Sequence, residues 1–251
     1  MEIADCRLAV LIDADNAPRT ALREIMAECV KYGTPTVRRI YGDWTMNNMD
    51  SWKPLLLDNA IIPIQQYSYT TGKNSTDSAM IIDAMDILHD GQVDGFVLVS
   101  SDSDFTRLAL RVREAGLKVY GIGEKKTPAP FIAACDKFTY VEVIRTAEMG
   151  KAEEKSATPT HGKRRAVPQD IVRLIAVAIQ DLSDEDGWVF MGELGNILPK
   201  RQSDFDPRNY GFEKLTTLVK SIDRFEIDAR PTSAPNVKHI YVRDKKARNL
   251  I

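Results

Sequence analysis

The first 145 residues alternate between short apolar runs and longer stretches that carry one apolar face. The apolar runs, each long enough for a strand, are Leu8–Ile12, Thr36–Tyr41, Ile61–Gln65, Phe96–Ser100 and Lys118–Ile122. Helical periodicity is expected between them, over about 18–32, 76–89 and 104–115. Such alternation is typical of a parallel sheet covered by helices on both faces. We therefore expect an α/β fold for this part of the chain.

Acidic residues stand where the predicted strands end. Asp13 and Asp15 follow the first strand, Asp102 and Asp104 follow the fourth, and Asp77 begins a predicted helix. Ligands bind parallel sheets beyond the carboxyl ends of the strands. Converging carboxylates without a nearby His or Cys favour a hard divalent cation such as Mg²⁺ or Mn²⁺. Two such ions about 4 Å apart activate water and stabilise the leaving oxygen of a phosphodiester.

Each acid alone has a simpler interpretation. Asp77 and Asp104 have good positions for helix N-caps, Asp15 fits a solvated turn, and Asp13 could close a loop. Several acids at one sheet edge, however, favour a metal or catalytic site over separate structural roles. Asp83, further along the helix of Asp77, is either another member of this group or a residue of the helix's polar face.

Three segments carry a resemblance to a known family: Leu11–Asn16, Lys73–Asp77 and Val99–Phe105, in that order. Together they resemble the NYN domains, relatives of the PIN-type nucleases, over about residues 6–145. The resemblance implies a PIN-like sheet and a metal-dependent ribonuclease. It also implies that Mg²⁺ or Mn²⁺ is held by Asp13, Asp77, Asp102 and Asp104, with help from Asn16. Asp15 falls on a variable position of the pattern, and Lys73 is a weak candidate for contact with phosphate.

Two later segments also resemble parts of that family. Residues 116–123 resemble its closing strand, and Ala134–Phe138 resemble its final helix. We therefore place a nuclease domain at residues 1–147.

The composition changes over residues 148–166. This stretch has almost no large apolar residue, so it cannot bury enough surface to offset the entropy lost on ordering, and it is predicted to be a flexible linker. The charge also differs on the two sides. Residues 1–150 carry 16 Lys and Arg against 21 Asp and Glu, a net charge of −5, and residues 151–251 carry 18 against 15, a net of +3. The division predicts two modules with different tasks.

The last 85 residues have a different pattern. Helices are expected over 171–182, 192–198 and 209–220, followed by two alternating segments, 222–227 and 237–242, that predict a hairpin. Helices followed by a two-stranded wing describe a small winged-helix-like α+β domain, which we place at residues 167–246. Its core is expected to hold Trp188, Leu194, Leu198, Tyr210, Phe212 and Leu215.

This part resembles the LOTUS (OST-HTH) domains, on the segments 187–198, 205–212 and 215–218. The resemblance covers about residues 167–245 and implies a module that binds RNA or a protein partner. The pairing with an NYN domain matches a bacterial architecture of that family. Weak candidates for contact with RNA phosphates are the basic residues Lys200, Arg201, Arg208 and Lys214.

The leading hypothesis is a metal-dependent RNA endonuclease that hydrolyses phosphodiester bonds, with RNA supplied by the C-terminal module. One alternative is an adaptor for RNA or protein with a silent nuclease fold. A lesser alternative is a haloacid-dehalogenase-like phosphatase, because Asp13-Ala14-Asp15 follows a first strand. That pattern continues with Thr or Ser where this chain has Ala17.

The cellular setting follows from simpler features. Cys6, Cys29 and Cys135 are widely spaced and odd in number, which disfavours a disulfide framework. No apolar run approaches the roughly 20 residues of a membrane-spanning helix. We therefore expect a cytoplasmic protein without membrane contact. Many PIN relatives dimerise, so a homodimer is one expected assembly.

Overall fold

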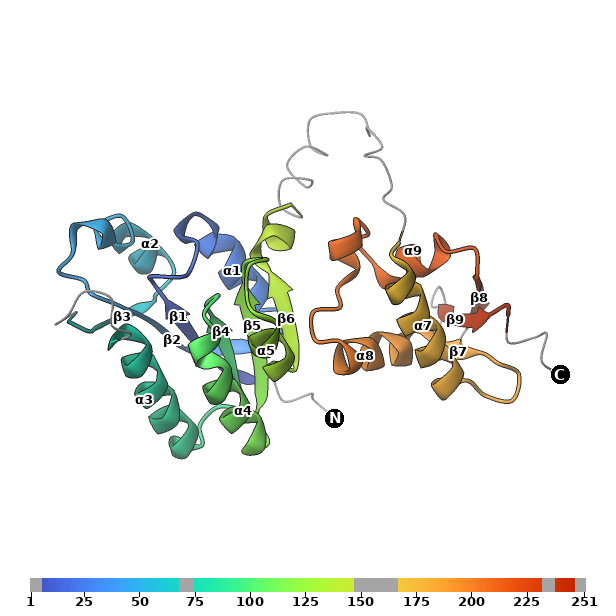
Figure 1. The fold of residues 1–251 in the computed structure, drawn as a ribbon, viewed down its shortest axis with the longest axis horizontal. Coiled ribbons are helices and arrows are strands. Elements are labelled where there is room, and N and C mark those ends of the chain that lie inside the picture. The colour runs from blue at the N-terminus through green and yellow to red at the C-terminus, as the bar shows by residue number, and fades with distance from the viewer. Residues whose placement is uncertain (1–5, 68–74, 147–166, 232–237, 247–251) are drawn as a thin grey trace, which may run out of the picture. The chain divides into compact units, whose positions relative to one another are not determined.

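The computed structural model describes residues 6–67, 75–146, 167–231 and 238–246 (Figure 1). The chain divides into two compact units, Met1–Ala152 and Glu153–Ile251, which are treated separately below. The predicted linker at 148–166 and the candidate Lys73 lie outside the described residues.

The first unit is built on a six-stranded parallel sheet with the order β3-β2-β1-β4-β5-β6. Its strands are β1 (Arg7–Asp13), β2 (Thr34–Gly42), β3 (Ile62–Gln65), β4 (Gly95–Val99), β5 (Lys118–Gly123) and β6 (Lys137–Tyr140). The two central strands, β1 and β4, are almost wholly buried, which explains their unbroken apolar runs. The predicted α/β class is confirmed.

Helices cover both faces of this sheet (Figure 1). They are α1 (Leu22–Cys29), α2 (Lys53–Asp58), α3 (Ser75–Asp90), α4 (Thr106–Glu114) and α5 (Ala129–Ala134), and residues 141–146 are also helical. Alternate residues of β1 supply two separate cores. Val10 and Ile12 pack with α1 and α2, whereas Leu11 packs with α3, α4 and α5.

Two expectations for this unit need correction. Ala134–Phe138 is not a helix: α5 ends at Ala134, Cys135 is extended, and Phe138 lies in β6, which pairs with β5. Phe138 packs so closely on β5 that a Cβ on Gly121 would lie 2.5 Å from its ring. The helix expected over 18–32 is also shorter, with a 3₁₀ turn at Arg19–Ala21 before α1.

The second unit combines three α-helices with a small antiparallel sheet of order β7-β9-β8. Its elements are α7 (Gln169–Leu182), β7 (Val189–Phe190), α8 (Met191–Arg201), a 3₁₀ turn (Pro207–Tyr210), α9 (Leu215–Lys220), β8 (Phe225–Pro231) and β9 (Lys238–Asp244). The core includes Ile175, Leu194, Leu198, Leu218 and Val242. The small α+β domain with a C-terminal hairpin is confirmed.

The helix expected over residues 209–220 is interrupted. Gly211 has a φ of +84°, a left-handed conformation that ends the 3₁₀ turn. The next residue, Phe212, is buried in the core, and α9 begins only at Leu215. The demand for one more buried ring therefore overrides helical continuity.

No helix in the described part of the chain is long and apolar enough to cross a membrane.

Candidate active site

The central strands bring Asp13 and Ser100 together at the carboxyl edge of the first sheet. β1 and β4 are parallel neighbours in which Ile12 pairs with Val99, so the residue after each pair leaves the sheet at the same level. Ser100 Oγ donates a hydrogen bond of 2.8 Å to Asp13 Oδ2. Both residues are only 1% exposed, so this bond is part of the interior.

Asp13 also organises the loop that follows it. Asn16 Nδ2 donates to Asp13 Oδ2 at 2.8 Å, and the backbone amides of Asp15 and Asn16 donate to Oδ1 at 3.1 and 3.3 Å. Burial raises the pKa of Asp13, and these hydrogen bonds together with that from Ser100 oppose the rise. Asp13 is thus a buried carboxylate that fixes the position of Asn16.

The loop after β4 carries the next two acids. The amide of Asp102 donates to Ser100 Oγ at 3.0 Å, and Asp102 Oδ1 accepts from the amide of Asp104 at 2.9 Å. Asp102 therefore caps the 3₁₀ turn Ser103–Phe105, so the capping role expected for Asp104 belongs to its neighbour. Ser100 links this loop to Asp13, because its hydroxyl contacts both.

Asp77 comes from a different segment, the first turn of α3. Its side chain is buried, at 8% exposure. The pKa of Asp77 is raised from 3.8 to about 6, first by burial and then by the negative charges of Asp13, Asp102, Asp104 and Asp15. The electrostatics therefore record acids from three separate segments of the chain at one place.

Asp77, Asp102 and Asp104 form a group that can hold a metal ion. Each offers one carboxylate oxygen, and these oxygens lie within 4.8 Å of one another. A set of carboxylate oxygens suits a hard divalent cation, whose charge would relieve the repulsion that raises the pKa of Asp77. Asp13 is not one of these three, although its charge acts on Asp77.

Asp83 has different partners. It forms an ion pair with Arg39 of β2, and it accepts a hydrogen bond of 2.5 Å from the hydroxyl of the fully buried Tyr41. Asp83 thereby ties α3 to the sheet. Of the two sequence interpretations, the structure favours neither a metal ligand nor a merely solvated residue, but an anchor for the helix that carries Asp77.

The basic candidates of the second unit divide into two kinds. Arg208 pairs with the buried Asp206 at 2.7 Å, and Arg201 pairs with Asp181 at 2.5 Å. Lys200 and Lys214 are exposed at the surface. Their contact with RNA stays a prediction, for which the two lysines are the better placed.

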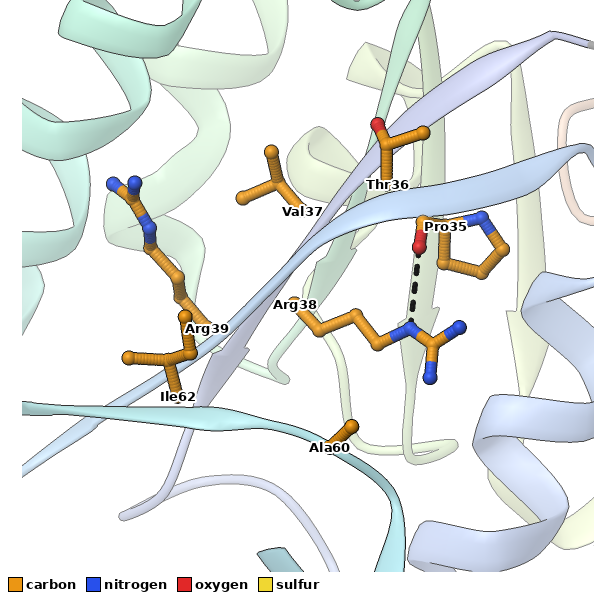
Figure 2. Close-up of a pocket in the computed structure, with 7 residues that line it drawn as sticks. All are labelled: Pro35, Thr36, Val37, Arg38, Arg39, Ala60 and Ile62. Carbon is orange, nitrogen blue, oxygen red and sulfur yellow. Dashed lines mark hydrogen bonds between the residues drawn. The ribbon is translucent and has the colours of Figure 1, made fainter.

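A groove of about 440 Å³ lies along β2, away from these acids in the sequence (Figure 2). Figure 2 shows Arg38 and Arg39 on opposite sides of the strand. Arg38 donates to the carbonyls of Pro35 and Asn59, at 3.2 and 3.1 Å, and Arg39 pairs with Asp83. The arginines of the groove therefore serve the fold.

Sequence reasoning missed the role of Ser100, which was assigned only to a strand. β4 ends at Val99, one residue earlier. A polar residue directly after an apolar run, two positions before an acid, was the available signal. Trp188 was expected in the core of the second unit, but it is not among the described residues that form or pack against that core.

Comparison with known proteins agrees with this architecture. The family described as NYN domain matches residues 7–142, more than half of the chain, and the OST-HTH/LOTUS domain matches residues 164–237. The chain belongs to the NYN family, with an OST-HTH/LOTUS domain after the NYN domain. No curated protein matches this chain.

Solved structures with similarity to the chain come from three bacteria. A protein of unknown function from Vibrio parahaemolyticus is 21% identical, with a TM-score of 0.47, over 55% of this chain and 94% of that one. An uncharacterized protein from Nitrosomonas europaea is 35% identical, with a TM-score of 0.29, over 36% of this chain and 90% of that one. A protein from Chromobacterium violaceum is 26% identical, with a TM-score of 0.25, over 34% and 88%.

Proposed function

We propose that the NYN unit is a metal-dependent RNA endonuclease that hydrolyses phosphodiester bonds. The observation that carries this proposal is the approach of Asp77, Asp102 and Asp104 to within 4.8 Å at the carboxyl edge of an NYN-family sheet. Parallel sheets bind their ligands at this edge. An enzyme has a use for such crowded acids, whose repulsion an ordinary structural role would avoid.

The residues fit Mg²⁺ or Mn²⁺. Asp77, Asp102 and Asp104 would hold the ion, and Asp13 would add negative charge behind them. When bound, a divalent ion of this kind lowers the pKa of water and offsets the negative charge that develops on a phosphodiester. The three carboxylates alone would repel the RNA backbone, so binding of the substrate at this edge requires a cation.

The surrounding side chains keep the acids in place. Ser100 Oγ accepts from the Asp102 amide and donates to Asp13, so one hydroxyl connects both strand ends. Asn16, held by Asp13, places a neutral side chain beside the acids. Such supporting hydrogen bonds fix the orientation of metal-binding carboxylates.

The phosphatase alternative requires Asp13 to act as a nucleophile. Both of its oxygens already accept hydrogen bonds, two from backbone amides and two from the side chains of Asn16 and Ser100. A carboxylate so engaged and buried is a poor nucleophile, which argues against this alternative.

We infer that the second unit binds RNA and supplies it to the acids. Residues 151–251 carry a net charge of +3, against −5 for residues 1–150. Because the two units belong to one chain, RNA held by the second unit has a raised local concentration at the first. The three cysteines are free thiols, and two of them are buried. They fit a reducing compartment, and we propose the cytoplasm.

The test is incubation of the full chain with a mixture of structured and unstructured RNAs. We expect internal cleavage with Mn²⁺ or Mg²⁺ and intact RNA in EDTA. Cleavage that persists in EDTA would contradict the metal-dependent mechanism. Intact RNA with either ion would favour the silent adaptor, in which the nuclease fold only binds.

A further inference from the structure

The sheet of the second unit has an outer face that its core does not use. Val189 and Val242 point into the core and pair with each other, so the next pair along, Phe190 and Tyr241, faces the other way. The same alternation places His239 and Arg243 of β9 and Arg230 of β8 on this outer face. With Trp188, these six residues form what we call the aromatic platform.

The platform is a connected stack of flat groups. The Arg230 guanidinium lies 4.2 Å from the Tyr241 ring centroid and 5.2 Å from that of Trp188, and Arg243 lies 4.5 Å from Trp188. Phe190 continues the row, with its ring centroid 5.8 Å from Tyr241 and 5.1 Å from His239. These distances are within the range of cation–π and aromatic contacts.

Folding of the unit does not account for these rings. Among the described residues, Trp188, Phe190 and Tyr241 are neither in the core nor packed against it, and none is fully buried. Trp188 is nevertheless held in place, because Asp184 Oδ1 accepts its backbone amide at 2.8 Å. A large aromatic surface kept in position outside the core marks an interaction site.

The charges of the platform nearly cancel. Arg243 pairs with Glu226 at 2.7 Å, and Arg230 pairs with Asp228 at 3.0 Å. Both acids lie on the same face, opposite Arg243 and Tyr241 in the register. Two arginines against two acids leave little net charge for phosphates, so the surface that remains on offer is flat and π-rich. The buried Nε of Arg243 has no hydrogen-bond acceptor among the described residues.

We propose that the aromatic platform binds unpaired nucleobases of single-stranded RNA by stacking. Every base has a π-face, and stacking on aromatic rings and guanidinium groups is the usual means of holding single strands. A duplex hides those faces within its own stack, so the platform selects single-stranded segments. This inference rests on the proposed RNA binding of the second unit, and it names the contact surface and the form of RNA.

The test measures binding of the full chain to a labelled 12-nucleotide RNA and to a duplex of the same length. EDTA keeps the RNA intact, so the result does not depend on nuclease activity. We expect tighter binding of the single strand. Trp188→Leu and Tyr241→Leu should each weaken that binding by about 5- to 100-fold, because stacking is worth about 1–3 kcal/mol per base. Tyr241→Phe keeps the ring and should bind like the wild type.

Salt dependence separates stacking from phosphate contacts. Each phosphate contact contributes about −0.7 to the slope of log affinity against log salt for a single strand. The Leu variants should keep the wild-type slope, whereas Lys200→Ala should make it shallower. Val177→Ala, at a residue on α7 that is 42% exposed, is the surface control and should change neither property. Melting curves should show all variants folded.

Three results would overturn the proposal. Leu variants that are folded and bind the single strand like the wild type would place the contact elsewhere on the unit. Equal or tighter binding of the duplex would contradict selection by unpaired bases. A wild-type chain that binds no RNA at low salt would refute the proposed RNA binding as well, and would make the platform a surface for a protein partner.

Discussion

The two units of this chain use charged side chains in opposite ways. In the NYN unit, acids from three segments crowd together until the pKa of Asp77 rises to about 6. In the OST-HTH unit, arginines are matched by acids, as in Arg208 with Asp206 and Arg224 with Asp244. Matched pairs stabilise a fold without help from outside. Crowded like charges weaken it until a cation arrives, so crowding is the better sign of a metal site.

The largest effect should come from supplying that cation. Mn²⁺ should raise the unfolding free energy of the NYN unit by about 3 kcal/mol when its concentration is 100 times Kd. Asp102→Asn removes one anionic ligand and should lose most of this gain. Asp86→Asn, at an exposed position on α3, is the matched control and should keep it. Calorimetry with and without Mn²⁺ gives the comparison. Equal stabilisation of the two variants would remove Asp102 from the metal site.

The matched pairs make the converse prediction for the second unit. Arg208→Ala leaves the buried Asp206 without its arginine and should destabilise that unit by about 2 kcal/mol, with or without Mn²⁺. Arg201→Ala breaks a pair whose aspartate is about half exposed, and it should cost less than about 1 kcal/mol. Urea unfolding of both variants measures the difference. An Arg208→Ala unit as stable as the wild type would show that pairing does not explain its charges.

Crowding in the NYN unit should also appear in its pH dependence without metal. A carboxyl whose pKa is raised on folding binds its proton more tightly in the folded state, so stability falls as pH rises from about 4 to about 6. Asp77→Asn removes this loss. In EDTA it should be more stable than the wild type by about 1–2 kcal/mol at pH 7.

At pH 4 the two proteins should be equally stable, because Asp77 is then protonated in the folded wild type. Denaturant unfolding at both pH values checks this. A variant less stable than the wild type at pH 7 would mean that Asp77 contributes favourable contacts that outweigh the repulsion.

The smallest effect concerns the supply of RNA. Replacing Lys200 and Arg201 by Ala should raise the apparent KM for RNA by about 3- to 10-fold and leave kcat nearly unchanged, the pattern of lost uniform binding. Lys118→Ala, at an exposed lysine at the start of β5 in the NYN unit, is the control and should leave KM unchanged. Steady-state cleavage of one labelled RNA measures both constants. A lower kcat at unchanged KM would assign the pair to the chemical step.

Sequence patterns predicted the NYN unit better than its partner. The apolar runs of β1 and β4 and the acids after them are local signals, and parallel pairing brings strand ends together without further information. The hydroxyl of Ser100 could not be placed in advance, because its role depends on the register between β1 and β4.

In the second unit, tertiary packing decided what local patterns could not. The burial of Phe212 interrupts the helix expected over 209–220. Trp188 has the composition of a core residue, and only the strand register shows that its neighbours Phe190 and Tyr241 face outward. Hydrophobicity predicts burial on average, so it misassigns aromatic residues that form a binding surface.

The most direct test of the central claim is single-turnover cleavage of RNA by the full chain in Mn²⁺, with Asp102→Asn compared against Asp86→Asn. Both variants lose one negative charge from the NYN unit, but only the first loses it from the acid cluster. The account predicts that Asp86→Asn cleaves like the wild type and that Asp102→Asn is slower by about 10²–10³-fold while remaining folded. Full activity in Asp102→Asn would contradict it.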